Sequence, residues 1–286
     1  MAISKAYDTS MKVFEQVSMK ASPKMYEQLR AIGPGEIAVV RGTYDHIETL
    51  LDTMKVPYDL IEPEQIPARN GGHVMFVNCR TYGNEKAVGG ARRFVDEGGR
   101  LVTTDWAISL VTRAFPGKLK KTKDTIDDVV EIECPTDLAR RFVGLNYAQC
   151  HPKWWLEGSS HIFDIGQGVV PVITSDEMEQ KYGKPYVAVG FAHGKGEVFH
   201  FISHLELQRT HLRSKTDKED LSVFLKKMGA TKTADMEDAT VAELEAAYST
   251  LNTLAHLCAP HPILNTDGKS VLMGKSTGPK SVKLVG

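Results

Sequence analysis

The sequence predicts an α/β fold with three layers, in which a mostly parallel sheet lies between helices. From Ile37 onward, short apolar runs with the length and β-branched content of buried strands alternate with segments of helical periodicity. Gly98, Gly99 and Gly183 follow helical segments and are suited to cap their C-terminal ends. Strands that alternate with helices at this spacing are typical of a parallel sheet that is covered on both faces.

The composition indicates a soluble globular protein. The chain has 286 residues, and 42% of them are hydrophobic, which is enough for a large core. The net charge of -1 supplies no overall field that would attract nucleic acid or an anionic membrane. No apolar run has the length of a signal peptide or of a membrane span, which requires about 18 residues. We therefore expect a cytoplasmic protein with no nucleic-acid partner and no membrane partner.

The cysteines lie far apart in the sequence and form no CxxC pair. This spacing argues against a zinc site and against a disulfide framework, and it favours a reducing compartment. The cysteines are Cys79, Cys134, Cys150 and Cys258.

The chain divides into four segments by pattern. We expect an N-terminal helical segment at 1–32, an α/β domain at 33–212, C-terminal helices at 213–260 and an extended tail at 261–286. The first segment has helical periodicity that is broken by Pro23, so it predicts one or two short amphipathic helices. These helices either cover the sheet or form an interaction arm.

The first half of the α/β domain contains four expected strands, at 37–40, 58–61, 73–78 and 101–104. Helices are expected between and after them, at 47–54, 85–97 and 106–115. Two adjacent glycines at 89–90 would weaken the second of these helices, so either the helix begins after them or a close packing contact requires them. The charged run at 118–124 is expected to be a surface loop.

The second half contains further expected strands, at 129–133, 169–174, 186–191 and 197–202, and a tight turn at 194–196 joins the last two. A short helix capped by Ser175 is expected between the second and the third. Two capping boxes, Thr216 with Glu219 and Thr240 with Glu243, predict the C-terminal helices. The second of these helices carries an apolar stripe of Val241, Leu244, Tyr248, Leu251 and Leu254.

The segment at 151–166 has the most unusual composition of the chain. Two adjacent tryptophans, Trp154 and Trp155, occur there with His151, Glu157 and His161. Aromatic faces with a few polar groups are typical of small-molecule sites, so these residues could line a pocket. Alternatively, Trp154 packs inward and Trp155 caps the edge of a sheet.

Two motifs resemble the class I glutamine amidotransferase-like superfamily. The first is GGRLVTTDWAI at 98–108, and the second is GKGEVFHFISHLELQR at 194–209. In that family, a nucleophilic cysteine lies where a strand turns into a helix, and a later strand ends in His-x-Glu. This chain has Asp105 at the turn and keeps His204 and Glu206. It is therefore most similar to the divergent, trehalose-utilisation-like type that lacks the cysteine, and the resemblance implies a flavodoxin-like sandwich.

The carboxyl ends of parallel strands form the ligand crevice in such sheets. The candidate catalytic residues at this edge are Asp105, His204, Glu206 and Cys79, the last as a displaced nucleophile or a buried core cysteine. A carboxylate at 105 lacks the reactivity of a thiolate toward an amide, so glutaminase activity is not expected. Asp105 and His204 alone are too few ligands to indicate a metal site, and no cofactor is expected. The candidate ligand-binding residues are Thr43, Tyr44, Asn78, Arg80, Thr104, Trp106, Trp154, Trp155 and His161.

The leading hypothesis is a non-catalytic amidotransferase-like protein that acts in binding or in the assembly of a protein complex. We expect a homo-oligomer or a protein partner, bound through the C-terminal helix and the tail. One alternative is a hydrolase that uses Cys79 or Asp105 with His204 and Glu206. Another alternative is a module that binds a carbohydrate or a small metabolite.

Overall fold

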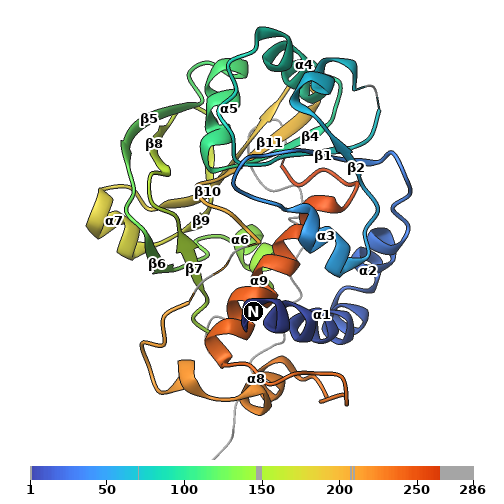
Figure 1. Cartoon of the computed structure of the whole chain (residues 1–286), viewed down its shortest axis with the longest axis vertical. Coiled ribbons are helices and arrows are strands. Elements are labelled where there is room, and N and C mark those ends of the chain that lie inside the picture. Colours follow the sequence, from blue (N-terminus) through green and yellow to red (C-terminus); the bar gives the residue numbers. More distant parts are fainter. Residues whose placement is uncertain (1, 70, 146–149, 207, 209, 265–286) are drawn as a thin grey trace, which may run out of the picture.

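The fold is built around a seven-stranded, mostly parallel sheet (Figure 1). The computed structural model describes residues 2–69, 71–145, 150–206, 208 and 210–264. The strand order is β2-β1-β3-β4-β11-β10-β9, and in this sheet only β10 runs against the others. The strands are β1 (Ile37–Val40), β2 (Asp59–Ile61), β3 (Val74–Val77), β4 (Arg100–Thr104), β9 (Val170–Thr174), β10 (Tyr186–His193) and β11 (Gly196–Phe201). The α/β class and the mostly parallel sheet that the sequence predicts are confirmed.

The central strands β1 and β3 are buried along their whole length, which explains their continuous apolar sequences. Each strand of the sheet lies within two residues of its predicted range at either end. The predicted tight turn joins β10 to β11 as an antiparallel hairpin.

Helices cover both faces of the sheet. In Figure 1, α4 and α5 lie above it, and α3 and α9 lie below it. The helices are α1 (Ala2–Ala21), α2 (Pro23–Arg30), α3 (Glu48–Met54), α4 (Glu85–Asp96), α5 (Ile108–Ala114), α6 (Asp137–Val143), α7 (Asp176–Tyr182), α8 (Leu221–Met228) and α9 (Val241–Cys258). None of the helices in the described ranges is both long and apolar enough to cross a membrane.

A close contact explains the glycine pair within α4. The helix spans both glycines, and a Cβ at Gly90 would come within 2.7 Å of Pro67 Cα. Pro67 lies in the 3-10 helix η1 (Pro63–Ala68), which packs on α4. The close-packing explanation therefore holds, and Gly89, with no atom within 4 Å of its Cβ position, does not contribute to it.

Two small antiparallel sheets flank the main one. β5 (Leu119–Asp124) pairs with β8 (His161–Ile165), and β6 (Asp128–Glu131) pairs with β7 (Lys153–Leu156). The prediction of a surface loop at 118–124 is therefore wrong. All residues of β5 after Leu119 are exposed, so the strand tolerates a charged sequence. Because that sequence has no alternation of apolar and polar residues, hydrophobic periodicity does not identify it as a strand.

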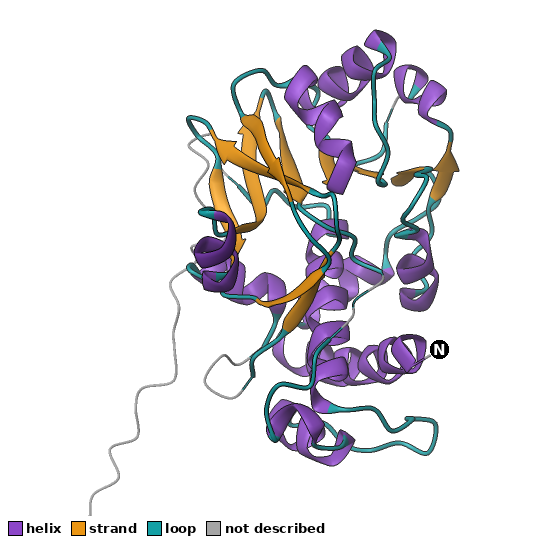
Figure 2. Ribbon diagram, turned by 60° about the vertical axis from the view of Figure 1, so that its left-hand side comes forward, coloured by secondary structure: helices purple, strands orange, loops and turns teal. Residues whose placement is uncertain are grey.

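The terminal helices form a helical layer beyond the sheet (Figure 2). α1 and α2 are separated at Ser22 before Pro23, as predicted, and α1 packs along α9. The capping box of Thr240 with Glu243 opens α9, and its whole apolar stripe is buried within the chain. α9 therefore offers no exposed apolar face to a partner along that stripe. The tail expected to bind a partner lies, from residue 265 on, outside the described residues.

α8 begins later than predicted. Thr216 and Asp217 belong to a 3-10 turn, η3 (Thr216–Lys218), and the cap of α8 is Asp220, whose side chain accepts a hydrogen bond from the backbone N–H of Ser222. The prediction that Thr216 with Glu219 caps this helix is wrong, because Asp220 lies nearer to the apolar run and is an equally good cap.

Candidate functional site

Asp105 occupies a sharp turn between β4 and α5. Its backbone φ of 44° lies in the left-handed region, which is uncommon for a residue other than glycine and is found where a local constraint requires it. η2 (Asp105–Ala107) and α5 follow at once, so the chain reverses direction at the carboxyl end of the strand. The side chain of Asp105 is 3% exposed. The strand-to-helix elbow expected from the sequence thus exists, and it buries a carboxylate.

Two further side chains contact Asp105 at this edge of the sheet, and a third contacts one of those two. The thiol of Cys79, after β3, donates a hydrogen bond of 3.2 Å to Oδ2 of Asp105. His204, after β11, places Nε2 3.4 Å from the same oxygen. Nε2 also lies 2.9 Å from Oε2 of Glu157, which directly follows β7. The structure therefore brings together Cys79, Asp105 and His204, as the sheet topology predicts.

The electrostatics of this cluster favour a charged histidine and a neutral thiol. Burial opposes the charge on His204, but its contacts with Asp105, Cys79 and Glu157 dominate and raise its pKa to about 12. Burial raises the pKa of Cys79 to about 12, and the carboxylate of Asp105 adds to this effect. At neutral pH the cluster therefore holds an imidazolium and a protonated thiol.

Glu206 does not orient His204. Its Oε1 accepts a hydrogen bond of 2.9 Å from the backbone N–H of His46. Nδ1 of His204 and Oε2 of Glu206 are both buried and make no hydrogen bond within the described part of the chain. Glu157 is the glutamate that contacts His204, although the sequence suggested it only as a pocket residue beside the tryptophans.

Asp45 is a buried carboxylate that sequence reasoning missed. It accepts hydrogen bonds from the hydroxyl of Thr104 and from the backbone N–H of Cys79, so it joins the ends of β3 and β4. Burial raises its pKa to about 7, and the nearby charge of Glu206 contributes to the shift. Its position beside the Gly42-Thr43-Tyr44 turn after β1 was the available signal.

Part of the predicted ligand-binding set forms an aromatic cluster near the elbow. Tyr44 lies edge-on to Trp106 with ring centroids 5.4 Å apart, and Trp106 stacks with His161 at 6.5 Å. Tyr44 is 53% exposed. We call these three residues the aromatic cluster. Thr43 is exposed and Arg80 is partly exposed at the same edge.

The other predicted ligand-binding residues are used inside the protein. Trp154 and Trp155 are buried, and the indole of Trp154 donates a hydrogen bond of 2.9 Å to Ser249 on α9. Asn78 donates to Glu48 at 2.9 Å, and the hydroxyl of Thr104 donates to Asp45. The inward-packing explanation holds for Trp154, and Trp155 lies against the ring of His204.

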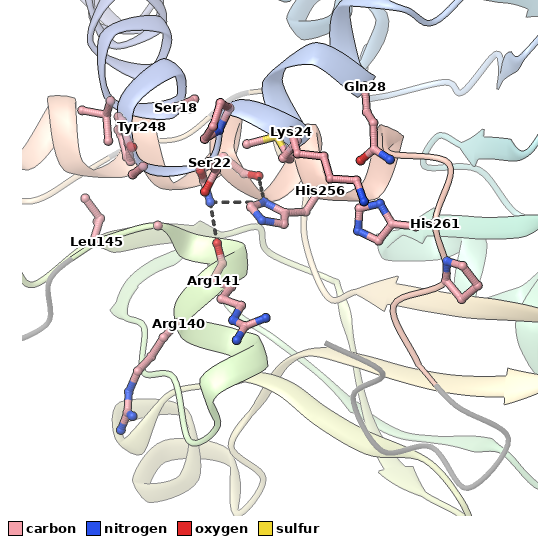
Figure 3. A pocket seen from close by; sticks show the side chains of 17 residues that line it. Ser18, Ser22, Lys24, Gln28, Arg140, Arg141, Leu145, Tyr248, His256 and His261 are labelled. Atoms are coloured by element: carbon pink, nitrogen blue, oxygen red, sulfur yellow. Dashed lines mark hydrogen bonds between the residues drawn. The ribbon is translucent and has the colours of Figure 1, made fainter. Parts of the chain in front are cut away.

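A separate pocket of about 1060 Å³ lies between α1, α2, α6 and α9 (Figure 3). No aspartate or glutamate is among the described residues that line it. Burial lowers the pKa of His256 to about 4, and its Nδ1 donates a hydrogen bond of 2.9 Å to the carbonyl of Asn252. Sequence reasoning missed this pocket because its walls come from three distant segments. Its basic or imidazole side chains are Lys24, Arg140, Arg141, His256 and His261.

Fold and site together define an α/β sandwich with a strand-to-helix elbow, a buried acid at the elbow and a histidine after β11. No family model and no curated protein matches the sequence. Among solved structures, the chain is similar to a glutamine amidotransferase from Methylobacillus flagellatus, with 13% identity and a TM-score of 0.46, over 79% of this chain and 93% of that one. It is also similar to a putative ThuA-like protein from Bacteroides uniformis, with 10% identity and a TM-score of 0.42, over 60% and 83%.

A third similar structure is the GH42 β-galactosidase Gan42B from G. stearothermophilus, with 14% identity and a TM-score of 0.41. The match covers 59% of this chain but 27% of the galactosidase, so the chain spans less than a third of that protein. The similar structures include both kinds of protein that the sequence resembles, namely a glutamine amidotransferase and a protein of the trehalose-utilisation-like (ThuA-like) type. At these identities the likeness concerns the fold alone.

Proposed function

We propose that the protein is a non-catalytic glutamine amidotransferase-like protein that acts by binding, in the assembly of a protein complex. The observation that carries this proposal is the arrangement around His204. In a nucleophilic triad, the base faces the nucleophile with one ring nitrogen and its orienting carboxylate with the other. Here Asp105 and Glu157 both face Nε2, and Nδ1 makes no hydrogen bond within the described ranges.

Cys79 is not activated as a nucleophile. The raised pKa of Cys79 keeps its thiol protonated at neutral pH, and the thiolate is the reactive form. His204 already carries its proton near pH 7, so it has no free lone pair with which to act as a general base. These features disfavour the competing function, a hydrolase that uses Cys79 or Asp105.

The aromatic cluster is the surface that supports a binding role. Tyrosine and tryptophan are enriched at the centres of protein interfaces, because they bury a large area at little cost in side-chain entropy. Tyr44 is among the few exposed large hydrophobic residues of the described chain. Its ring contacts Trp106, whose indole donates a hydrogen bond of 2.8 Å to the carbonyl of Ser159 and is thereby held in place.

Two measurements test the proposal. Incubation with glutamine should release no ammonia above buffer, and activity that disappears in Asp105→Ala or Cys79→Ala would contradict it. In light scattering, Tyr44→Ala should show a lower molar mass of the assembly than the parent chain. Alternatively, in pull-downs with the tagged chain, it should fail to retain a partner that the parent chain retains. The matched control is Met19→Ala, because Met19 is 58% exposed but lies on α1. Equal behaviour of the parent chain and Tyr44→Ala would refute a role for this surface.

A second candidate function is the binding of a small anionic metabolite in the pocket between the terminal helices. The observation that favours it is the lining, which contains basic side chains and, within the described ranges, no carboxylate side chain. Calorimetry with inorganic phosphate and with citrate should show binding that weakens in Lys24→Met. Lys20→Met is the control, because Lys20 is exposed nearby at the end of α1 but does not line the pocket. Absence of binding by either anion would exclude this function for these probes.

A further inference from the structure

We propose that Cys79, Asp105, Glu157 and His204 form a zinc-binding site. The donor atoms of Cys79, Asp105 and His204, namely Sγ, Oδ2 and Nε2, lie together in one small space. Oε2 of Glu157 approaches this group at Nε2 of His204. Thiolate, imidazole and carboxylate are the ligand types that Zn²⁺ binds, and it usually takes four of them. The sequence pointed only to Asp105 and His204. The fold adds Cys79 from the end of β3 and Glu157 from the end of β7.

The spacing of the donor atoms matches that of a zinc site. Sγ of Cys79 lies 3.2 Å from Oδ2 of Asp105, and Nε2 of His204 lies 3.4 Å from that oxygen. Nε2 lies 2.9 Å from Oε2 of Glu157, and the donors of the other three residues are all within 4.8 Å of one another. Donors bound about 2.0 to 2.3 Å from zinc in a tetrahedron are separated by about 3.3 to 3.5 Å. These three contacts agree with such edges to within about 0.5 Å, and completion of the tetrahedron requires Oε2 of Glu157 to move toward Sγ and Oδ2 as the ion binds.

Unsatisfied buried atoms are an independent sign of a missing ligand. Nε2 of His204 and Oε2 of Glu157 approach each other closely but are not aligned for a hydrogen bond, and neither makes one elsewhere within the described chain. The side chain of His204 is 1% exposed, so bulk solvent does not reach it. Buried polar atoms are rarely left without partners, and an ion held among these groups would satisfy them.

Such a site would be structural. With Glu157 as the fourth ligand, the ion would have no open position for substrate or water, which is the arrangement of structural rather than catalytic zinc. On binding, the thiol proton of Cys79 and the Nε2 proton of His204 leave to solvent, and both atoms bond the ion. The ion would tie the elbow after β4 to the ends of β3, β7 and β11. This inference goes beyond the proposed function, since it holds whether or not the protein assembles into a complex.

Metal loading of the full chain tests the site. The protein is stripped with a chelator, equilibrated with Zn²⁺, dialysed and analysed by mass spectrometry for metals, and we expect one zinc ion per chain. Loading with Co²⁺ instead should give the visible bands of tetrahedral cobalt and a thiolate-to-cobalt charge-transfer band. Cys79→Ser should abolish the charge-transfer band. Cys258→Ser, which changes another buried cysteine outside the cluster, should keep it.

Glu157→Gln provides a second variant that is expected to fold, because the Glu157 side chain is 30% exposed. It should weaken zinc binding by at least the roughly 10- to 100-fold that loss of a supporting residue costs at metal sites. Circular dichroism of the metal-free variants checks that they fold. The proposal is overturned if the parent chain retains no zinc, if Cys79→Ser keeps the charge-transfer band, or if Glu157→Gln binds zinc as tightly as the parent.

Discussion

Replacing Arg100 by methionine should cost about 3 to 5 kcal/mol of stability, because Arg100 and Glu197 form a buried ion pair that holds the end of α9. Both side chains are at most 6% exposed. The guanidinium donates two hydrogen bonds to Oε1 of Glu197, at 2.8 and 2.5 Å. It also donates to the carbonyls of Leu257, Ala259 and His261, each at 2.6 Å.

The magnitude follows from what the substitution leaves behind. Arg100→Met keeps most of the side-chain volume. It leaves a buried carboxylate without its charged partner and three buried or partly buried carbonyls without their hydrogen-bond donor. Removing one partner of a buried ion pair costs about 3 to 5 kcal/mol, because the remaining charge has no compensation. Glu197 keeps its bonds from the backbone N–H groups of Ile263 and Leu264, which places the expected loss toward the lower end of that range.

Chemical denaturation followed by tryptophan fluorescence measures this loss. The control is Arg92→Met, since Arg92 is 52% exposed and pairs with Asp96 at 3.8 Å across one helical turn. An exposed pair of this kind contributes about 0.3 to 0.5 kcal/mol. The reasoning is refuted if Arg100→Met loses less than about 1 kcal/mol, or no more than the control does.

Three further outcomes are expected. Burial lowers the pKa of His200 to about 3, so at this position only the unfolded chain gains a proton between pH 7.5 and 5. His200 should therefore contribute a fall in stability of about 2 kcal/mol over that range. His200→Asn should lack this contribution, and an equal fall in both proteins would count against it. Gly90→Ala should destabilise α4 by about 1 to 3 kcal/mol through its clash with Pro67, whereas Gly89→Ala should stabilise it by up to about 1 kcal/mol; thermal melts that rank the two the other way would disprove the packing argument. Cys79 should react slowly with iodoacetamide at pH 7 in the folded chain because its thiol is buried and protonated, and rapid alkylation at that pH would indicate an activated nucleophile.

The main sheet could be predicted from the sequence, and so could the part of the site that is formed by Cys79, Asp105 and His204. Both depend on local pattern and on sheet topology. Continuous apolar runs identify buried parallel strands wherever the chain enters the core, as in β1 and β3. The carboxyl ends of such strands meet at one edge, so Cys79, Asp105 and His204 were expected at the same edge of the sheet. The order β3-β4-β11 in the structure makes their strands adjacent and brings the three side chains together.

The remainder depends on contacts between distant segments that no local pattern encodes. β5 carries a charged sequence because only its first residue is buried, and its partner β8 lies about forty residues away in the chain. Glu157 directly follows β7, which belongs to a small sheet with β6 and not to the main sheet, so strand ends of the main sheet do not predict its contact with His204. The pocket in Figure 3 combines residues from 17–28, 140–145 and 248–262, so it exists only once the two ends of the chain have packed together.

The carboxylate at the elbow changes what the surrounding groups must do. A buried Asp105 is costly unless a positive charge lies beside it, and His204 supplies that charge in the absence of a metal. The proton that makes His204 a suitable partner for Asp105 is the same proton that prevents it from acting as a base. A zinc ion in this position would replace the proton as the source of positive charge. Because it would bind Nε2 of His204, it would also prevent His204 from acting as a base. Both the protonated and the zinc-bound arrangement keep the buried groups closed to other molecules, whereas Tyr44 of the aromatic cluster is 53% exposed at the same edge.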